Sequence, residues 1–450
     1  MKKISLLLAF MLMFQSCEHM IEIDLPTDQI NSEKVFKDKK SASSVLTNLY
    51  INLRENSFLT AKNQGIGTLL SLYTDELEPI SSSVTSDNFL LFNNTLDPTK
   101  NVLLSLWNTS YAHIYGINDF INRVSNSNGI DSNDKDQLLA DAYILRAIYY
   151  QILTQIFGDI PYTVTTNYKE NTSIKKTRYK EVLDHIEQDL LHANEITSYS
   201  YRSSNKYYPN KAVVELILAK NYLLQKKYDQ TESLAKTILS NPLYSIETDL
   251  SKTFKSTSKS TLWQLSNSSS IAATYEARNY VMLSNNAPYK LSKALLNSFD
   301  NHDLRKKNWT KEYLNSNRFY AFKYKNHLNN TDECSILFRI EEAYFVLCEA
   351  LIYQNKEKEA IPYLNIIRQK AGLSPLTNTL TKEQILIVML EESQKEFFLE
   401  HGRRFLDLKR NNKLSLLKAT KPNWQDKHAL LPYPEKEILI NPNLNPQNEY

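Results

Sequence analysis

The chain has 450 residues, of which 42% are apolar, so it can bury a sizeable core in one large domain or in two or three smaller ones. It contains only 7 glycines, whereas average usage would give roughly thirty, and this scarcity disfavours sheet-rich folds with many tight turns. The formal net charge is only +3, and basic residues are interspersed with acidic ones. The composition therefore favours a mostly helical protein and excludes a nucleic-acid partner.

The first residues predict a signal peptide. Two lysines precede an apolar run over residues 4–14, which is too short for a permanent membrane anchor. Ser16 immediately before Cys17 is similar to a bacterial lipoprotein cleavage site. We therefore predict that residues 1–16 are removed and that Cys17 becomes the lipid-modified first residue, which places the protein on a membrane. An ordinary secretory signal followed by an incidental cysteine is the alternative.

Two carboxylates and a polar segment come next. Asp75 and Glu78 could serve a glycosidase, one as acid and one as base or nucleophile, although carboxylates at a helix end are far more often solvated charges. Residues 81–100 are rich in Ser and Asn and include Phe89 and Phe92. We predict a long loop there, and loops of this length tend to be functional or mobile.

From residue 102 onward, apolar residues recur at three- and four-residue spacing, which predicts helices with one buried face. Together with a helix predicted over about residues 41–53, they group into about four hairpins in two blocks, at about 40–240 and 336–410, with a spacing similar to tetratricopeptide repeats. Such hairpins stack because a single one cannot bury its own apolar face. In the first block, the helix that carries Arg146 ends at Gly158, where glycine suits a C-cap, and Pro161 prevents its continuation.

Residues 241–333, between the two blocks, are irregular: Ser, Asn and Thr cluster there, and aromatic residues are scattered among them. Irregular segments on a rigid helical scaffold often carry binding sites. Sugars stack their apolar ring faces on flat aromatic side chains, while amides and carboxylates bind the hydroxyls. We therefore predict that a ligand is bound by aromatic residues of this segment and of the earlier loop, namely Tyr275, Tyr280, Tyr289, Tyr320, Phe89 and Phe92.

The histidines and cysteines of the sequence indicate neither a metal site nor another cofactor. His185 and His192 lie seven positions apart on one predicted helix, about 10 Å along its axis, which is too far for them to share a metal by themselves. Cys334 and Cys348 are spaced unfavourably for a disulfide bond with each other. Prolines after residue 412 predict an extended, docked tail over 412–450.

The stretch Glu391–Arg410 is the close of an amphipathic helix followed by basic residues. Gly402 stands where we expect this helix to end, because glycine enters the left-handed C-cap conformation without a steric penalty. Arg403 and Arg404 follow as a basic turn, and Asp407 is close enough to pair with one of the two guanidinium groups. By itself, this pattern indicates only a helix terminus with a local ion pair.

Taken together, four strings in the chain resemble motifs of the SusD/RagB family, which are surface lipoproteins of Bacteroidetes that capture nutrients: residues 145–161, 299–305, 400–410 and 431–444. The similarity covers nearly the whole chain. It implies a single, mostly α domain over residues 17–450. In that fold, about four tetratricopeptide-like hairpins pack against an irregular, loop-rich region with little β structure.

The same resemblance implies a place and a role. The protein would be lipid-anchored in the outer membrane and face the cell exterior. There it would bind an oligo- or polysaccharide and deliver it to a SusC-like TonB-dependent transporter, without a catalytic step. The motif residues would be structural rather than ligand-binding: Arg146, Gly158, Asp159, Gly402, Arg404 and Asp407.

Other functions stay open at this point. A peptide could replace the glycan, as in RagB-like relatives, and a tetratricopeptide scaffold could serve as an adaptor for a protein partner. A glycoside hydrolase that uses Asp75 and Glu78 is the least favoured, because no nucleophile elbow, metal cluster or phosphate loop accompanies them.

Overall fold

The computed structural model describes residues 36–450 except 61, 63–64, 81–82 and 378. The predicted signal peptide and Cys17 lie outside the described residues.

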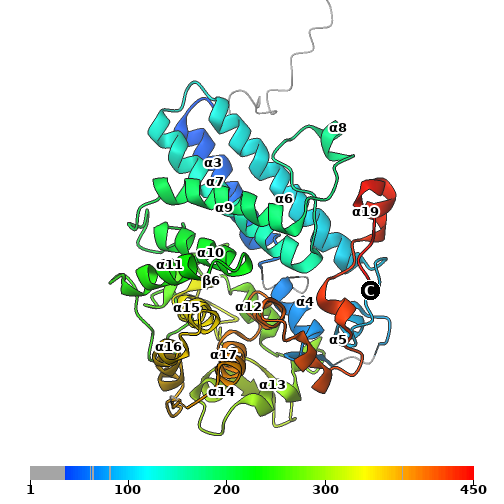
Figure 1. Cartoon of the computed structure of the whole chain (residues 1–450), viewed down its shortest axis with the longest axis vertical. Coiled ribbons are helices and arrows are strands. Elements are labelled where there is room, and N and C mark those ends of the chain that lie inside the picture. Colours follow the sequence, from blue (N-terminus) through cyan, green and yellow to red (C-terminus); the bar gives the residue numbers. More distant parts are fainter. Residues whose placement is uncertain (1–35, 61, 63–64, 81–82, 378) are drawn as a thin grey trace, which may run out of the picture.

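Long helices form a scaffold in which consecutive helices pack side by side. In order of packing, they are α6 (Asn101–Asn126), α7 (Ser132–Phe157), α9 (Tyr179–Ile196), α10 (Lys211–Leu224), α11 (Tyr228–Ser240), α15 (Glu341–Tyr353), α16 (Glu357–Lys370), α17 (Lys382–Phe397) and α18 (Arg403–Arg410). An earlier helix, α3 (Lys39–Glu55), packs on both α6 and α7. Figure 1 shows this stack running from α6, α7 and α9 at the top to α15, α16 and α17 in the lower half. The mostly helical fold predicted from the sequence is confirmed.

Local sequence sets several helix boundaries. The Asp131 carboxylate accepts a hydrogen bond from the amide of Asp134 and so caps the first turn of α7. The same helix ends before Gly158, as predicted, and glycine adopts the positive φ of 81° there without steric cost. At the start of α17, Thr381 and Gln384 form a capping box.

Two regions that were predicted to lack helices contain short ones. The segment 81–100 includes α5 (Asp87–Phe92), whose first turn is capped by Ser86, so the prediction of a continuous loop is wrong there. The tail contains α19 (Glu435–Ile440) and three 3-10 turns, so the prediction of an extended tail is also wrong in part. The physical reason is that Pro434 and Pro442 stand at the start of helical turns, where proline is tolerated.

The remaining short helices lie before α6, after α7 and in the segment between the two helical blocks. They are α4 (Ile66–Tyr73), α8 (Tyr168–Asn171), α12 (Tyr275–Tyr280), α13 (Lys293–Ser298) and α14 (Leu304–Trp309). Strands in the described residues form three antiparallel pairs: β1 (Leu77–Pro79) with β3 (Tyr289–Leu291), β2 (Thr261–Leu265) with β6 (Ser335–Arg339), and β4 (Thr310–Glu312) with β5 (Phe319–Ala321). The prediction of little β structure is therefore confirmed.

One continuous apolar core includes side chains from the scaffold and from residues 241–333. Trp263 of β2 and Trp309 of α14 are fully buried in it. The segment predicted to be irregular therefore contributes to the core as well as to the surface. Cys334 and Cys348 are buried and free, so they do not form a disulfide bond with each other, as the spacing predicts.

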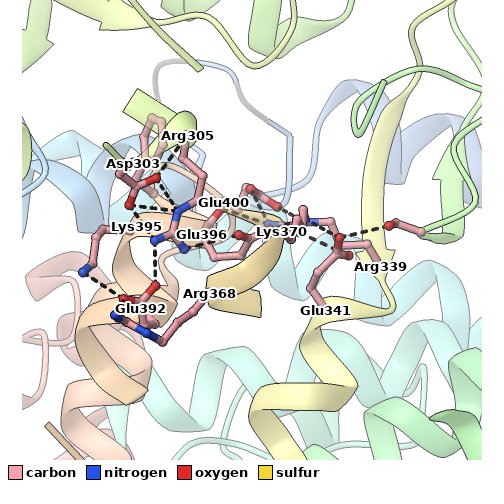
Figure 2. A network of polar contacts seen from close by, with 12 residues as sticks. Asp303, Arg305, Arg339, Glu341, Arg368, Lys370, Glu392, Lys395, Glu396 and Glu400 are labelled. Atoms are coloured by element: carbon pink, nitrogen blue, oxygen red, sulfur yellow. Dashed lines mark hydrogen bonds and ion pairs between the residues drawn. The ribbon is translucent and has the colours of Figure 1, made fainter. Parts of the chain in front are cut away.

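A buried ion network fastens this segment to the scaffold (Figure 2). Nη2 of Arg305 lies 2.6 Å from Oε2 of Glu392. Nη1 of Arg339 and Nζ of Lys370 lie 2.6 and 2.8 Å from Oε1 of Glu396. All five side chains are at most 1% exposed. The network therefore ties α14 and β6 to α16 and α17; its labelled members are Asp303, Arg305, Arg339, Glu341, Arg368, Lys370, Glu392, Lys395, Glu396 and Glu400.

Candidate functional site

The C-terminal signature folds differently from the sequence prediction. The helix α17 ends at Phe397, and Gly402, with φ of 69°, precedes the next helix instead of ending the same one. Arg403 and Arg404 therefore begin α18, and the prediction of a basic turn is wrong. A β-carbon on Gly402 would lie 2.4 Å from Cδ1 of Leu70, so close packing against α4 and the backbone conformation both require glycine.

The charged residues of this signature have partners inside the protein. Nε and Nη2 of Arg404 donate to the two carboxylate oxygens of Asp75 at 3.0 and 2.9 Å. Nη2 of Arg410 donates to Asp407 at 2.8 Å. Burial alone would raise the pKa of Asp407, but the charges of Arg403 and Arg410 hold it at about 2. Because Arg404, Asp75 and Asp407 are all buried, this geometry supports a structural role for the signature.

The motif at the end of α7 also joins separate elements. Nη2 of Arg146 lies 2.7 Å from Oδ1 of Asp189, which connects α7 to α9. The carboxylate of Asp159 accepts a hydrogen bond from the amide of Tyr179 at 2.7 Å. Its carbonyl oxygen accepts one from the Tyr433 hydroxyl at 2.6 Å. The motif thus fastens α7 to α9 and to the tail.

The two carboxylates considered for glycosidase chemistry are bound in the same way. Besides Arg404, the amide of Gln394 donates to Asp75 at 3.0 Å. Glu78 accepts a hydrogen bond from the backbone amide of Lys293 at 2.9 Å. Both carboxylates therefore have structural partners, and their geometry lends no support to a hydrolase.

The six aromatic residues predicted to bind a ligand lie in different surroundings. Tyr280 and Tyr289 are buried, with ring centroids 6.2 Å apart. Tyr320 is also buried and belongs to a small, separate apolar cluster. Phe89 and Phe92 are half-buried in α5. None of these five lines the cleft that contains the sixth residue.

That sixth residue, Tyr275, lines a cleft of about 710 Å³, which we call the Tyr275 cleft. Its walls come from the end of α3, from Lys62 beyond it, from the first turns of α6 and from α12. Ser105 and Thr109 lie one turn apart on α6 and both line the cleft. Neither hydroxyl bonds to another described residue, so both are available to a ligand. The volume is typical of sites for small ligands.

The charged side chains that line the cleft are Glu55, Lys62 and Arg278. Oε1 of Glu55 lies 2.7 Å from Nε of Arg54, and Oε2 accepts a hydrogen bond from the Tyr275 hydroxyl. Burial opposes the charge of Glu55, but these bonds hold its pKa below the ordinary value. Burial and the same hydrogen bond raise the pKa of Tyr275 to about 12. Nζ of Lys62 lies 4.6 Å from the centroid of the Tyr275 ring, and the guanidinium carbon of Arg278 lies 5.5 Å from it.

A second cavity, of about 360 Å³, lies between α6, α8 and the tail, and we call it the α6–tail groove. Its lining residues on α6 project from a different face of that helix than those of the Tyr275 cleft. Tyr115 and Tyr168 line it and are 50% and 68% exposed. Neither residue was predicted to bind a ligand. Tyr115 lies within α6 and Tyr168 begins α8, and no local pattern shows that residues of α19 line the same groove.

The described part of the chain contains no group of three or more His, Cys, Asp or Glu side chains placed to hold a metal ion. His185 stacks on Tyr162 with ring centroids 4.3 Å apart, and His192 packs edge-on against Tyr143. None of the helices in the described residues is both long and apolar enough to cross a membrane.

Two family models match overlapping parts of the chain. Residues 27–223 match a family described as "Starch-binding associating with outer membrane". Residues 162–450, well over half of the chain, match the SusD family. Together, the two matches cover both helical blocks, the segment between them and the tail.

Individual relatives agree with these matches. SusD-like protein P2 of Formosa agariphila is 24% identical over 94% of this chain and 95% of its own length. A SusD superfamily protein from Bacteroides vulgatus has a similar fold, with a TM-score of 0.79 at 17% identity over 92% of this chain and 99% of its own. Surface glycan-binding protein A from Bacteroides thetaiotaomicron, solved in complex with laminarihexaose, has a TM-score of 0.75 at 18% identity over 92% of this chain and 100% of its own.

Proposed function

Because this chain belongs to the SusD/RagB family, we propose that it is a cell-surface lipoprotein that binds an oligo- or polysaccharide and passes it to a SusC-like TonB-dependent transporter. The family description of association with the outer membrane supports this location. The extended scaffold supports the transporter-facing role, because stacked helical hairpins offer a large rigid surface to a protein partner.

The Tyr275 cleft is the observation that carries glycan binding. The free hydroxyls of Ser105 and Thr109 can bind sugar hydroxyls, and the ring of Tyr275 adds an apolar surface. The complex of the similar glycan-binding protein A with laminarihexaose supports a glycan as the ligand class. We place the ligand at Tyr275 rather than at Tyr280 or Tyr320, because the rings of the latter two are buried.

Membrane attachment through Cys17 is the second part of the proposal. The apolar leader and the Ser16–Cys17 junction support it. Replacing Cys17 with Ser should release the protein from the outer-membrane fraction, while external protease should digest the wild-type protein on intact cells. A Cys17→Ser protein that stays in the membrane fraction would contradict lipid anchoring.

We propose binding without catalysis, because Asp75 and Glu78 are bound by structural partners. Incubation with candidate glycans should therefore leave the polymer length unchanged. The appearance of shorter products with purified protein would contradict this part of the proposal.

Calorimetry on the mature protein tests ligand binding, with laminarin and other glycans in one panel and peptides in a second. Tyr275→Ala should weaken glycan binding by about tenfold or more, because loss of an aromatic contact and its neighbouring bonds costs roughly 1.5 kcal/mol. Tyr168→Ala is the matched control, since this exposed tyrosine lines the α6–tail groove instead. Weaker binding in Tyr168→Ala alone would move the site to that groove. Peptide binding without glycan binding would contradict the sugar ligand.

A further inference from the structure

The Tyr275 cleft has more positive than negative charge. Its single acidic side chain, Glu55, already has a partner, because Arg54 lies 2.7 Å from one of its oxygens and Tyr275 donates to the other. The cleft also contains two cations, Lys62 and Arg278. Lys62 is already partly paired, because its ammonium group donates to the backbone carbonyl of Glu55 and lies 3.8 Å from Oε2 of the same residue. Arg278 is exposed and pairs with no acidic side chain in the described residues.

Both cations contact the ring of Tyr275. The ring of Tyr275 faces the ammonium group of Lys62 at 4.6 Å and the guanidinium group of Arg278 at 5.5 Å, which are distances for cation–π contacts. Because a cation already lies over the ring and Glu55 already accepts from its hydroxyl, Tyr275 is only partly available as a stacking platform. A neutral sugar would therefore find fewer unused groups in the cleft than a charged one.

An anionic sugar would use what the cleft leaves unpaired. A guanidinium group binds a carboxylate or sulfate through two parallel hydrogen bonds, and such charge-assisted bonds are stronger than those to neutral hydroxyls. The free hydroxyls of Ser105 and Thr109 can donate to the remaining oxygens. The excess of cations is local, because the whole chain has a formal charge of only +3 over 450 residues.

From this geometry we infer that the ligand of the Tyr275 cleft is an acidic polysaccharide, whose carboxylate or sulfate groups bind Arg278 and Lys62. The inference rests on the proposed glycan-binding function and specifies its ligand class. Arg278 provides the two parallel hydrogen bonds. Lys62, which contacts the same Tyr275 ring, adds a second positive charge.

Matched pairs of glycans test the inference, since each pair shares one backbone and differs only in charge. The probes are oligogalacturonate with its methyl ester, and a sulfated galactan with its desulfated form; laminarin is the uncharged reference. The acidic member of at least one pair should bind the mature protein about tenfold more tightly than its neutral partner, as one charge-assisted contact allows. The pair that shows the preference identifies carboxylate or sulfate as the recognised group.

Arg278→Gln should reduce this preference to about onefold to twofold. Arg178→Gln, which removes an exposed arginine outside the cleft, should keep it. Raising the salt concentration from about 0.1 M to about 1 M should weaken the binding of acidic glycans more than the binding of laminarin, because the electrostatic screening length falls from about 10 Å to about 3 Å.

The outcomes separate this inference from the proposed function. Equal affinity for both members of each pair, or an unchanged preference in Arg278→Gln, would overturn the acidic ligand. If laminarin binding is then still lost in Tyr275→Ala, glycan binding stands and only the ligand class is wrong. If no glycan of either kind binds, the proposed function itself fails.

Discussion

Two regions of the molecule use charged residues in opposite ways. In the buried ion network, the cations of Arg305, Arg339 and Lys370 each lie within 2.8 Å of a carboxylate oxygen and have almost no exposed surface (Figure 2). In the Tyr275 cleft, Arg278 is exposed and pairs with no acidic side chain in the described residues. The residue types are the same, but the pairing differs.

The cost of removing a charge from water explains the contrast. A buried ion loses its hydration, and the loss is offset only when a partner of opposite charge is close and well oriented. A cation at the mouth of a cleft keeps its water and needs no partner until a ligand displaces that water. An arginine without a partner beside a cleft is therefore a better sign of binding than the arginines of the network, which serve the fold.

Removing a cation from the network should have the largest effect. Arg339→Met would leave Glu341 and Glu396 buried with a partner missing, and the free energy of unfolding should fall by about 3–5 kcal/mol. Urea unfolding measures the change. Lys413→Met is the control, because its pair with Glu383 is exposed to solvent and should contribute no more than about 0.5 kcal/mol. Equal effects of the two changes would contradict the contrast.

The pH dependence of stability should reflect the buried ion pairs that Asp407 makes with Arg403 and Arg410. The pKa of Asp407 is about 2 in the folded protein and about 3.9 in an unfolded chain. Because the folded value is the lower one, this carboxylate stabilises the fold above about pH 4, and the contribution of about 2–3 kcal/mol is lost as the pH falls towards 2. In urea unfolding from about pH 7 down to about pH 3, the deficit of Asp407→Asn relative to wild type should therefore shrink. A constant deficit would show that Asp407 does not titrate as proposed.

Much of the scaffold can be predicted from sequence because its signals are local. The spacing of apolar residues predicts helices such as α6 and α7, and the end of α7 at Gly158 is confirmed. The prediction that Gly402 ends a helix was wrong, because the same glycine conformation can end one helix or precede the next. Which of the two occurs depends on the contact of Gly402 with Leu70.

The site depends on contacts that no local pattern contains. Asp75 and Arg404 are 329 positions apart, and nothing near either residue predicts the other as its partner. Tyr275 and Tyr280 belong to one six-residue helix, yet the first lines a cleft and the second is buried. Composition therefore selected aromatic residues of this segment but could not distinguish rings that line a cleft from rings of the core.

Within the cleft, the hydroxyl of Tyr275 should contribute modestly. Tyr275→Phe keeps the ring but removes the hydrogen bond to Glu55, and the free energy of unfolding should fall by about 1 kcal/mol or less, because both side chains are partly exposed. The pKa of Glu55 should rise, since the Tyr275 hydrogen bond helps to lower it. Carboxylate carbon NMR measures this pKa directly. An unchanged value would show that the hydrogen bond is not populated in solution.

The smallest expected change in stability is that of Arg278→Gln, and it tests most directly whether a charged residue serves binding or the fold. Arg278→Gln should change the free energy of unfolding by no more than about 0.5 kcal/mol, because Arg278 has no ion pair to lose. Arg54→Gln is the matched control, because Arg54 is the ion-pair partner of Glu55 in the wall of that cleft. Arg54 bonds both Glu55 and the carbonyl oxygen of Ser266, so its loss should cost about 1–2 kcal/mol in the same urea titration. If Arg278→Gln proved as costly as Arg54→Gln, Arg278 would serve the fold and would no longer be free to select an acidic ligand.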